Sequence, residues 1–167
     1  MTLTPEERGV IMSLTESREE LRLQLRRELH ATEEAVFDAL VNPEKQKVWL
    51  SPPGAGAVQT TVDLRVGGAW EARFHPDHLT AVHDVQTYLV IDRPHRLVTD
   101  LVSESARGGQ PMPALHSRVD ITLEPTVWGT LMTVEQSGFP SVDVRDFFEA
   151  VVWPGGFDRI ESFLTGR

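Results

Sequence analysis

Three histidines gathered near the middle of the chain are the first candidates for chemistry. His75 and His78 flank the pair Pro76-Asp77, and His83 follows with Asp84 beside it. Imidazole and carboxylate groups bind divalent metal ions, so a site from His75, Asp77 and His78 fits by residue type. However, the spacing matches no zinc motif, and Pro-Asp is typical of a hairpin turn. We therefore interpret the segment as a solvated turn and predict no metal and no organic cofactor.

Two residues on a predicted strand, His83 and Tyr88, have side chains that suit acid–base work. A histidine titrates near neutral pH, so His83 on the inner face of a sheet would serve as a hydrogen-bonding anchor for a ligand or as a general base. Tyr88 is the second catalytic candidate. The sequence leaves open whether the protein is an enzyme at all.

The other familiar catalytic patterns have simpler interpretations or are missing. Arg118 would suit a carboxylate ligand, but like Asp120 and Glu135 it alternates with apolar residues and is expected to face solvent. Gly67-Gly68 is followed by a strand pattern and not by a helix, which argues against a phosphate loop. No Gly-x-Ser-x-Gly motif is present, which argues against a serine hydrolase.

The composition excludes several classes of partner. The net charge of −9 disfavours binding to nucleic acid or to an anionic membrane. The chain has no cysteine, so it has no disulfide framework and no thiol nucleophile. Apolar runs are far shorter than the ~20 residues of a membrane span, and the first residues lack a signal-peptide pattern. We expect a cytoplasmic protein.

The first ordered elements are predicted to be a strand and two helices. Leu21, Leu23 and Leu25 alternate with polar residues, which predicts a strand with one buried face. Thr32 has the residue type and position of a helix N-cap. Asn42 has the same role for a second short helix that begins at Pro43. The loop Ser51–Gly56 follows.

A series of strands with short connections is predicted next. The alternation of apolar and polar residues, together with the turn signals, predicts strands at residues 59–66, 70–74, 82–91, 96–102, 118–123 and 131–136. Ser103–Ala114 contains several glycines and prolines and is predicted to be a loop. Short connections favour antiparallel neighbours.

The segment from Ser141 to Leu164 is predicted to form one long helix. Its apolar residues recur at i, i+3, i+4, i+7 and i+8 and give a single stripe: Val144, Phe147, Phe148, Val151 and Val152. Pro154 removes an amide donor, so we expect a kink or brief break at Trp153–Gly156.

Together these elements predict an α+β fold in which a curved antiparallel sheet wraps around a long C-terminal helix, with two short helices after the first strand. We assign residues 21–167 to this single domain. Residues 1–20 are predicted to be an N-terminal arm or a short helix, because Thr4-Pro5 resembles a helix start and the pattern extends to about Leu14.

Five motifs in this order resemble the activator-of-heat-shock-protein-90-ATPase homologue family, which belongs to the START-like, helix-grip (SRPBCC) superfamily. The motifs are the helix-to-tryptophan stretch Ala31–Trp49, the Asp-Leu-Arg-x-Gly-Gly-x-Trp hairpin Asp63–Trp70, the segment Val90–Val98, Ser137-Gly138-Phe139, and the terminal pattern Trp153–Leu164. The resemblance extends from about residue 21 to 164.

The resemblance implies the helix-grip fold with a deep pocket between sheet and helix. The sequence departs from the family pattern in three ways: Val90 replaces a glutamate, the glycine usual early in that strand is missing, and Arg93 replaces a proline. The superfamily contains lipid carriers, hormone receptors, aromatase/cyclases and co-chaperone domains, so the fold does not by itself define a function.

We interpret the protein as a binder of a small hydrophobic or aromatic molecule, with the ligand entering near Ser51–Gly56 and Ser103–Ala114. The alternative that these apolar residues simply fill the core stays open. The candidate ligand-binding residues are Trp49, Trp70, Phe74, His83, Val119, Ile121, Met132, Val134, Gln136, Phe147, Phe148, Val151 and Val152.

Two other functions remain open at this point. A cyclase- or hydrolase-like enzyme would use the same cavity with His83 or Tyr88 as acid or base. A co-chaperone-like interaction module would need an exposed apolar patch, and Trp128 and the N-terminal arm are the hints of one. The sequence also leaves open whether the chain forms a homodimer.

Overall fold

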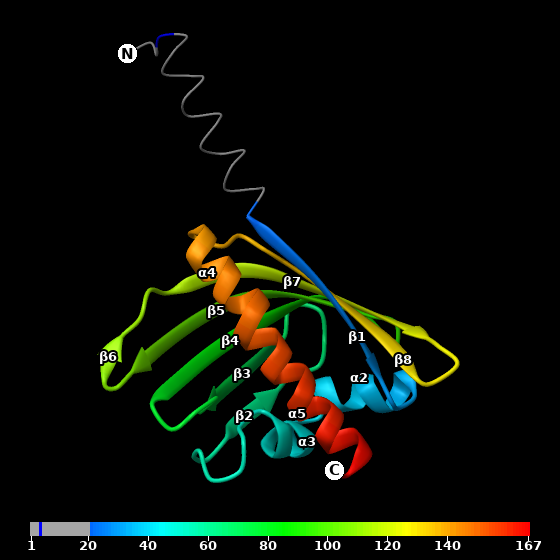
Figure 1. The fold of residues 1–167 in the computed structure, drawn as a ribbon. Coiled ribbons are helices and arrows are strands. Elements are labelled where there is room, and N and C mark those ends of the chain that lie inside the picture. Colours follow the sequence, from blue (N-terminus) through cyan, green and yellow to red (C-terminus); the bar gives the residue numbers. More distant parts are fainter. Residues whose placement is uncertain (1–3, 5–20) are drawn as a thin grey trace.

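One antiparallel sheet bends around the long C-terminal helix in the computed structural model (Figure 1). The structure describes Thr4 and residues 21–167. The predicted arm or helix in residues 1–20 therefore lies outside the described residues, Thr4 excepted. The predicted α+β helix-grip architecture is confirmed, with two short helices after the first strand.

The first strand and the two short helices form where local sequence signals predict them. Strand β1 is Arg22–Leu29, helix α2 is Glu33–Val41 and helix α3 is Pro43–Trp49. The Thr32 hydroxyl accepts a hydrogen bond from a backbone amide in the first turn of α2 at 3.2 Å. Asn42 caps α3 in the same way at 3.0 Å. Each side chain satisfies an amide that has no partner within its helix.

Seven further strands complete the sheet. They are β2 Gln59–Val62, β3 Ala69–Phe74, β4 Thr80–Asp92, β5 Arg96–Arg107, β6 Gln110–Pro111, β7 Leu115–Pro125 and β8 Thr130–Ser137. The strand order is β1-β8-β7-β5-β4-β3-β2, and β6 pairs with β5. β1 and β2 are therefore the two edges, and the ends of the sheet curve toward the same face (Figure 1).

Two predicted boundaries are wrong. The strand predicted at 59–66 ends at Val62, because the chain turns when the Arg65 amide bonds back to the Asp63 carbonyl at 2.9 Å. The loop predicted at Ser103–Ala114 is largely strand: β5 continues to Arg107 and β6 follows. This part of β5 is rich in serine and charged residues, and its pairing with β4 overrides their weak strand preference.

The Gly67-Gly68 turn connects β2 to β3 and needs both glycines. Gly67 has φ +84°, a conformation that other residues rarely adopt. A Cβ on Gly68 would lie only 2.2 Å from the Asp63 carbonyl oxygen. The hairpin predicted from the sequence is thus present, and the pair has a structural role.

The long C-terminal helix is continuous but irregular. It comprises α4 Val142–Phe147, the π-helical turn η1 Phe148–Val152 and α5 Trp153–Thr165. The irregularity lies just before the predicted position, since Pro154 occupies the first turn of α5 and cannot donate a backbone hydrogen bond into the preceding turn. A π turn therefore replaces the predicted kink or break.

The core lies between the inner face of the sheet and this helix. Phe157 and Ile160 of α5 are each 2% exposed and join a cluster that includes Phe37 of α2 and Tyr88 of β4. α5 approaches α2, α3 and β1 most closely. Among the described residues, no helix is long and apolar enough to cross a membrane.

Candidate functional site

Strand β4 places three polar side chains on the inner face of the sheet. Its residues Asp84 and Gln86 pair with Ala72 and Trp70 of β3, both of which are buried against the core. Tyr88 is two residues after Gln86, so it lies on the same face of the strand, and it is fully buried. We call this inner surface, from β3 to β8, the concave face.

Most polar groups on the concave face hydrogen-bond to one another. The Thr99 hydroxyl donates to the Gln86 carbonyl oxygen at 2.6 Å. The predicted ligand-binding residue Gln136 donates to the Ser117 hydroxyl at 2.8 Å and accepts from the Trp153 indole N–H at 2.8 Å. This second chain ties the long helix to β7 and β8.

Two tryptophans that the sequence predicted to bind a ligand, Trp49 and Trp70, also hydrogen-bond within the protein. The Trp49 indole N–H donates to the Ala39 carbonyl at 2.8 Å, which fixes α3 against α2. The Trp70 indole donates to the Thr60 hydroxyl at 2.9 Å, and that hydroxyl donates to Gln46 at 2.6 Å. Both side chains are buried, so their main contribution is to packing.

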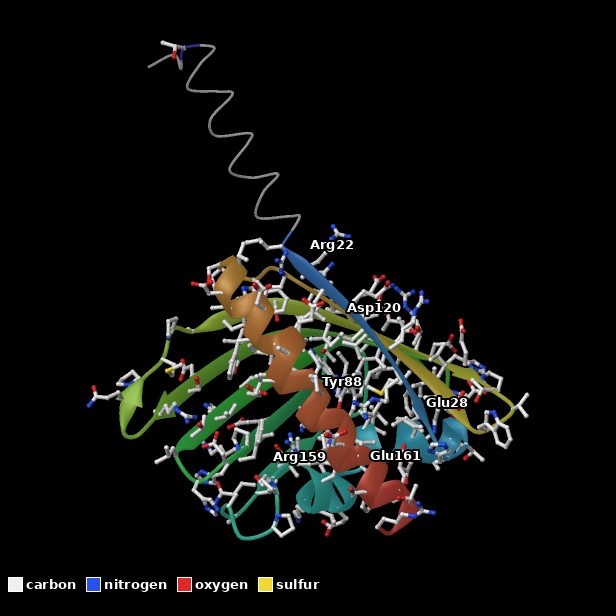
Figure 2. The ribbon with its side chains drawn as sticks, in the orientation of Figure 1. Arg22, Glu28, Tyr88, Asp120, Arg159 and Glu161 are labelled. Atoms are coloured by element: carbon white, nitrogen blue, oxygen red, sulfur yellow. The ribbon has the colours of Figure 1, made fainter. Side chains whose placement is uncertain are left out.

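Two buried side-chain atoms of the described residues have no hydrogen-bond partner: Oη of Tyr88 and Oδ1 of Asp84. Both belong to β4 and to the concave face, and Figure 2 labels Tyr88. Burial raises the pKa of Asp84 to about 6, against a hydrogen bond from Ser103 and the charge of His83, which lower it. Burial also raises the pKa of the Tyr88 phenol. Unsatisfied buried groups are uncommon in folded proteins and call for an explanation.

The amino-terminal half of the long helix covers the sheet incompletely. Phe148 is half-buried and packs on Phe139 with ring centroids 5.4 Å apart. Phe147 and Val151, in contrast, are 53% and 54% exposed. The prediction that one apolar stripe is buried along this segment is therefore wrong for these two residues, because the helix contacts the sheet along one side of the stripe.

His83 lies on the opposite side of the sheet from the predicted one. It pairs with the exposed Arg73 of β3, and its Nε2 lies 3.1 Å from the Glu71 carboxylate. Alternation thus sends His83 outward and its neighbour Asp84 inward. The prediction of a histidine on the concave face is corrected: the titratable group there is Asp84.

A cavity of about 690 Å³ lies near the tips of β3, β4 and β5. Its lining includes one row on the outer face, namely Arg73, His83 and Glu104, and one row on the inner face, namely Phe74, Val82 and Ser105. Of the predicted ligand-binding residues it includes Phe74 and His83. Its inner row is two residues along the strands from the row of Asp84, but Asp84 and Tyr88 do not line the cavity.

The segment with three histidines forms the predicted hairpin turn. The Asp77 carboxylate accepts hydrogen bonds from the Leu79 and Thr80 amides at 2.8 and 2.9 Å. The His75 ring lies against the Thr80 carbonyl at 3.2 Å. Within the described part of the chain, no three histidine, aspartate or glutamate side chains gather in a metal-binding arrangement.

The predicted ligand-binding residues separate into three groups. Seven are buried, namely Trp49, Trp70, Val119, Ile121, Met132, Val134 and Gln136. Four are partly exposed, namely Phe74, His83, Phe148 and Val152. Phe147 and Val151 are exposed. Sequence reasoning missed Asp84, although its even spacing from Tyr88 on one strand places both on the same face.

Comparisons with known proteins agree with this architecture. A family model described as Activator of Hsp90 ATPase homolog 1-like protein matches residues 30–165. No curated protein matches the chain in sequence.

Solved structures of bacterial proteins have the same fold. A protein from Mycobacterium smegmatis is similar with a TM-score of 0.69 and 20% identity, over 90% of this chain and 94% of its own. A protein from Rhizobium loti is similar with a TM-score of 0.65 and 26% identity, over 86% of this chain and 96% of its own. A putative uncharacterized protein from Rhizobium leguminosarum has a TM-score of 0.68 and 24% identity, over 87% and 95%.

Proposed function

We propose that this chain, which belongs to the family of Activator of Hsp90 ATPase homolog 1-like proteins, binds a small apolar or aromatic molecule on its concave face. The START-like helix-grip fold supports this proposal, because it places a curved sheet opposite a long helix. The finer question is which part of that interior accepts a ligand.

The observation that carries the proposal is the pair of unpartnered polar atoms on β4. Leaving a buried donor or acceptor without a partner costs about 1–3 kcal/mol. The Tyr88 hydroxyl and Asp84 Oδ1 are both in this state, whereas the neighbouring Gln86 has its partner. A ligand with a polar group would supply the missing hydrogen bonds and remove this cost.

The apolar part of the site comes from the helix and from β3. Phe147 and Val151 expose apolar surface that the protein itself does not cover. Phe74 and Phe148 are partly exposed at the edge of the core. Ligand sites typically combine such apolar walls with a few polar groups that fix orientation. Coverage by a ligand would remove this apolar surface from water.

The arrangement gives less support to an enzyme. The enzyme alternative uses His83 or Tyr88 as acid or base, and His83 lies on the outer face of the sheet, away from the concave face. The raised pKa of Tyr88 also opposes a role as general base at neutral pH. We therefore propose binding without a reaction.

One observation favours a second function, that of a co-chaperone-like interaction module. Val127 and Trp128, in the turn between β7 and β8, are 93% and 73% exposed. Exposed aromatic residues are common at protein interfaces. The family description refers to an activator of the chaperone Hsp90, which is consistent with a protein partner.

The two functions are separable by experiment. Protein purified from cells would be extracted with solvent and analysed by native and denaturing mass spectrometry, and tested for Nile red binding. We expect Phe147→Ala to weaken dye binding and Trp128→Ala to leave it unchanged. If Nile red fails to bind, or binds only through Trp128, the ligand-binding proposal is wrong and the interaction module is preferred.

A further inference from the structure

Resting on the ligand-binding function proposed above, we infer that Asp84 determines the chemical class of ligand. The concave site accepts an aromatic or apolar molecule that carries a hydrogen-bond donor, such as an amine or a hydroxyl, and it disfavours a carboxylate.

The position of Asp84 makes its carboxylate unusual. It occupies a row of four residues across the sheet, between Ala72 of β3 and Ser103 of β5, with Leu115 of β7 beyond. Ala72 is 1% exposed and Leu115 is 5% exposed. A charged group inside such a row loses hydration, which must be compensated by hydrogen bonds.

The protein supplies only part of that compensation. The Ser103 hydroxyl bonds to the Asp84 carboxyl group, but Oδ1 has no partner. Within the described residues, no arginine, lysine or histidine side chain forms an ion pair with Asp84; its neighbour His83 contacts Glu71 instead. An ionised carboxylate accepts hydrogen bonds and donates none. The ligand group that pairs with Oδ1 of Asp84 must therefore be a hydrogen-bond donor.

Two arginines beside the long helix have partners within the protein. Arg27 of β1 pairs with Asp158 of α5 at 2.9 Å and lies over the Phe157 ring. Arg159 of α5 donates to the Trp49 carbonyl at 3.0 Å. Asp84 is the carboxyl group that β4 places on the concave face, and its negative charge disfavours a carboxylate ligand there.

Tyr88 offers a second hydrogen-bonding group beside Asp84 and does not oppose the preference for a donor over a carboxylate. Its hydroxyl is on the same face of β4, four residues further along, and it also lacks a partner. A phenol both donates and accepts hydrogen bonds, so it tolerates either kind of ligand group. The discrimination between donors and carboxylates therefore comes from Asp84.

The test uses four probes with one shared apolar ring system. They are 2-naphthylmethylamine, 2-naphthalenemethanol, 2-naphthoic acid and 2-methylnaphthalene, and each is titrated into the full chain at pH 7.5 by calorimetry or by naphthalene fluorescence. A hydrogen bond to a charged group corresponds to about ten- to hundredfold in affinity. We expect the amine and the alcohol to bind at least about tenfold more tightly than the acid.

Two variants assign the effect to Asp84. Asp84→Asn keeps the size of the side chain and removes its charge, so the ratio between amine and acid should fall to near one. The matched control is Asp100→Asn on β5, whose carboxylate lies on the outer face 3.0 Å from His116. This control should keep the wild-type ratio, and circular dichroism confirms that each variant is folded.

The outcomes separate this inference from the proposed function. If the wild-type chain binds none of the four probes, the ligand-binding proposal fails together with the inference. Equal binding of amine and acid by the wild-type chain, with Phe147→Ala weakening both, would leave the site intact and overturn the role of Asp84. Asp84→Ser provides a second check, because it also removes the charge.

Discussion

The two halves of the C-terminal helix differ in how the rest of the protein holds them. In α5, Phe157 and Ile160 are almost completely buried, and the helix packs against α2, α3 and β1. In α4 and η1 no residue is buried, and Phe147 and Val151 are half exposed. One continuous helix thus has a buried half, α5, and a half with exposed apolar side chains, α4–η1.

Polar contacts follow the same division. The α5 segment is tied to β1 through Arg27 and Asp158, and Glu161 lies 2.6 Å from the His30 ring (Figure 2 labels Glu161). Its Arg159 reaches the backbone of α3. In the α4–η1 segment the Phe148 ring packs on the Phe139 ring. The π turn interrupts the α-helical pattern of backbone hydrogen bonds. π turns are frequent at functional sites. On the proposed function, the ligand would contact α4–η1 and not α5.

The largest expected effect is on the anchored half. Ile160→Ala removes a fully buried side chain and leaves a cavity, so we expect the free energy of unfolding to fall by about 2–5 kcal/mol. The measurement is urea denaturation followed by circular dichroism. The matched control, Val151→Ala in η1, should cost less than about 1 kcal/mol, since its side chain is half exposed. Equal losses in the two variants would remove the distinction between the halves.

The second effect is on the charge inside the concave face. Asp84 has a folded pKa of about 6 against an ordinary value of 3.8, so the folded state holds its proton more tightly than the unfolded state. The folded state is thus penalised as pH rises from 3.8 to 6, and by pH 7 the penalty reaches about 3 kcal/mol.

Asp84→Asn removes this penalty. We expect it to raise the free energy of unfolding at pH 7.5 by up to about 3 kcal/mol, with the gain shrinking to nothing as pH falls to 3.8. Urea denaturation at several pH values checks the sign. A variant that is less stable than wild type at pH 7.5 would contradict the assigned burial of the charge.

The third effect tests the connection between η1–α5 and the sheet. Gln136→Leu removes both the bond to Ser117 and the acceptor for the Trp153 indole N–H. The buried Ser117 hydroxyl and the partly buried Trp153 indole N–H would each lose a partner, and we expect the free energy of unfolding to fall by about 1–3 kcal/mol. Urea denaturation measures this loss, and an unchanged free energy of unfolding in Gln136→Leu would contradict the role of the two bonds.

The sequence predicts the scaffold better than it predicts the site. Caps at Thr32 and Asn42, and the alternation in most strands, depend on neighbours along the chain, so local patterns are sufficient for them. The end of β5 has weak strand signals and exists through its partner β4, which local patterns do not contain. The extension to Arg107 was therefore missed.

The candidate site depends on which way each side chain faces, and the wrong predictions for His83 and Phe147 are errors of this kind. The assignment of His83 to the inner face conflicted with the parity of its own strand: Tyr88 is five residues away and therefore faces the other side. The exposure of Phe147 depends on where the helix lies over the sheet. Helical periodicity gives the width of an apolar stripe but not how much of it a neighbour covers.

The smallest expected change in stability is at Phe147, and it is the most direct test of the comparison between the two halves. Its ring is 53% exposed and contacts Phe148 edge-on, with centroids 6.4 Å apart. Phe147→Ala should therefore change the free energy of unfolding by less than about 1 kcal/mol.

If α4–η1 forms one wall of the ligand site, Phe147→Ala should also lose most of its affinity for 2-naphthalenemethanol. The reason is that a bound ligand would cover the Phe147 ring and remove its apolar surface from water. Calorimetric titration measures that affinity, with Val127→Ala at the far turn as the exposed control. Unchanged affinity would place the ligand away from α4–η1, and the exposed apolar surface of this half would then need another partner.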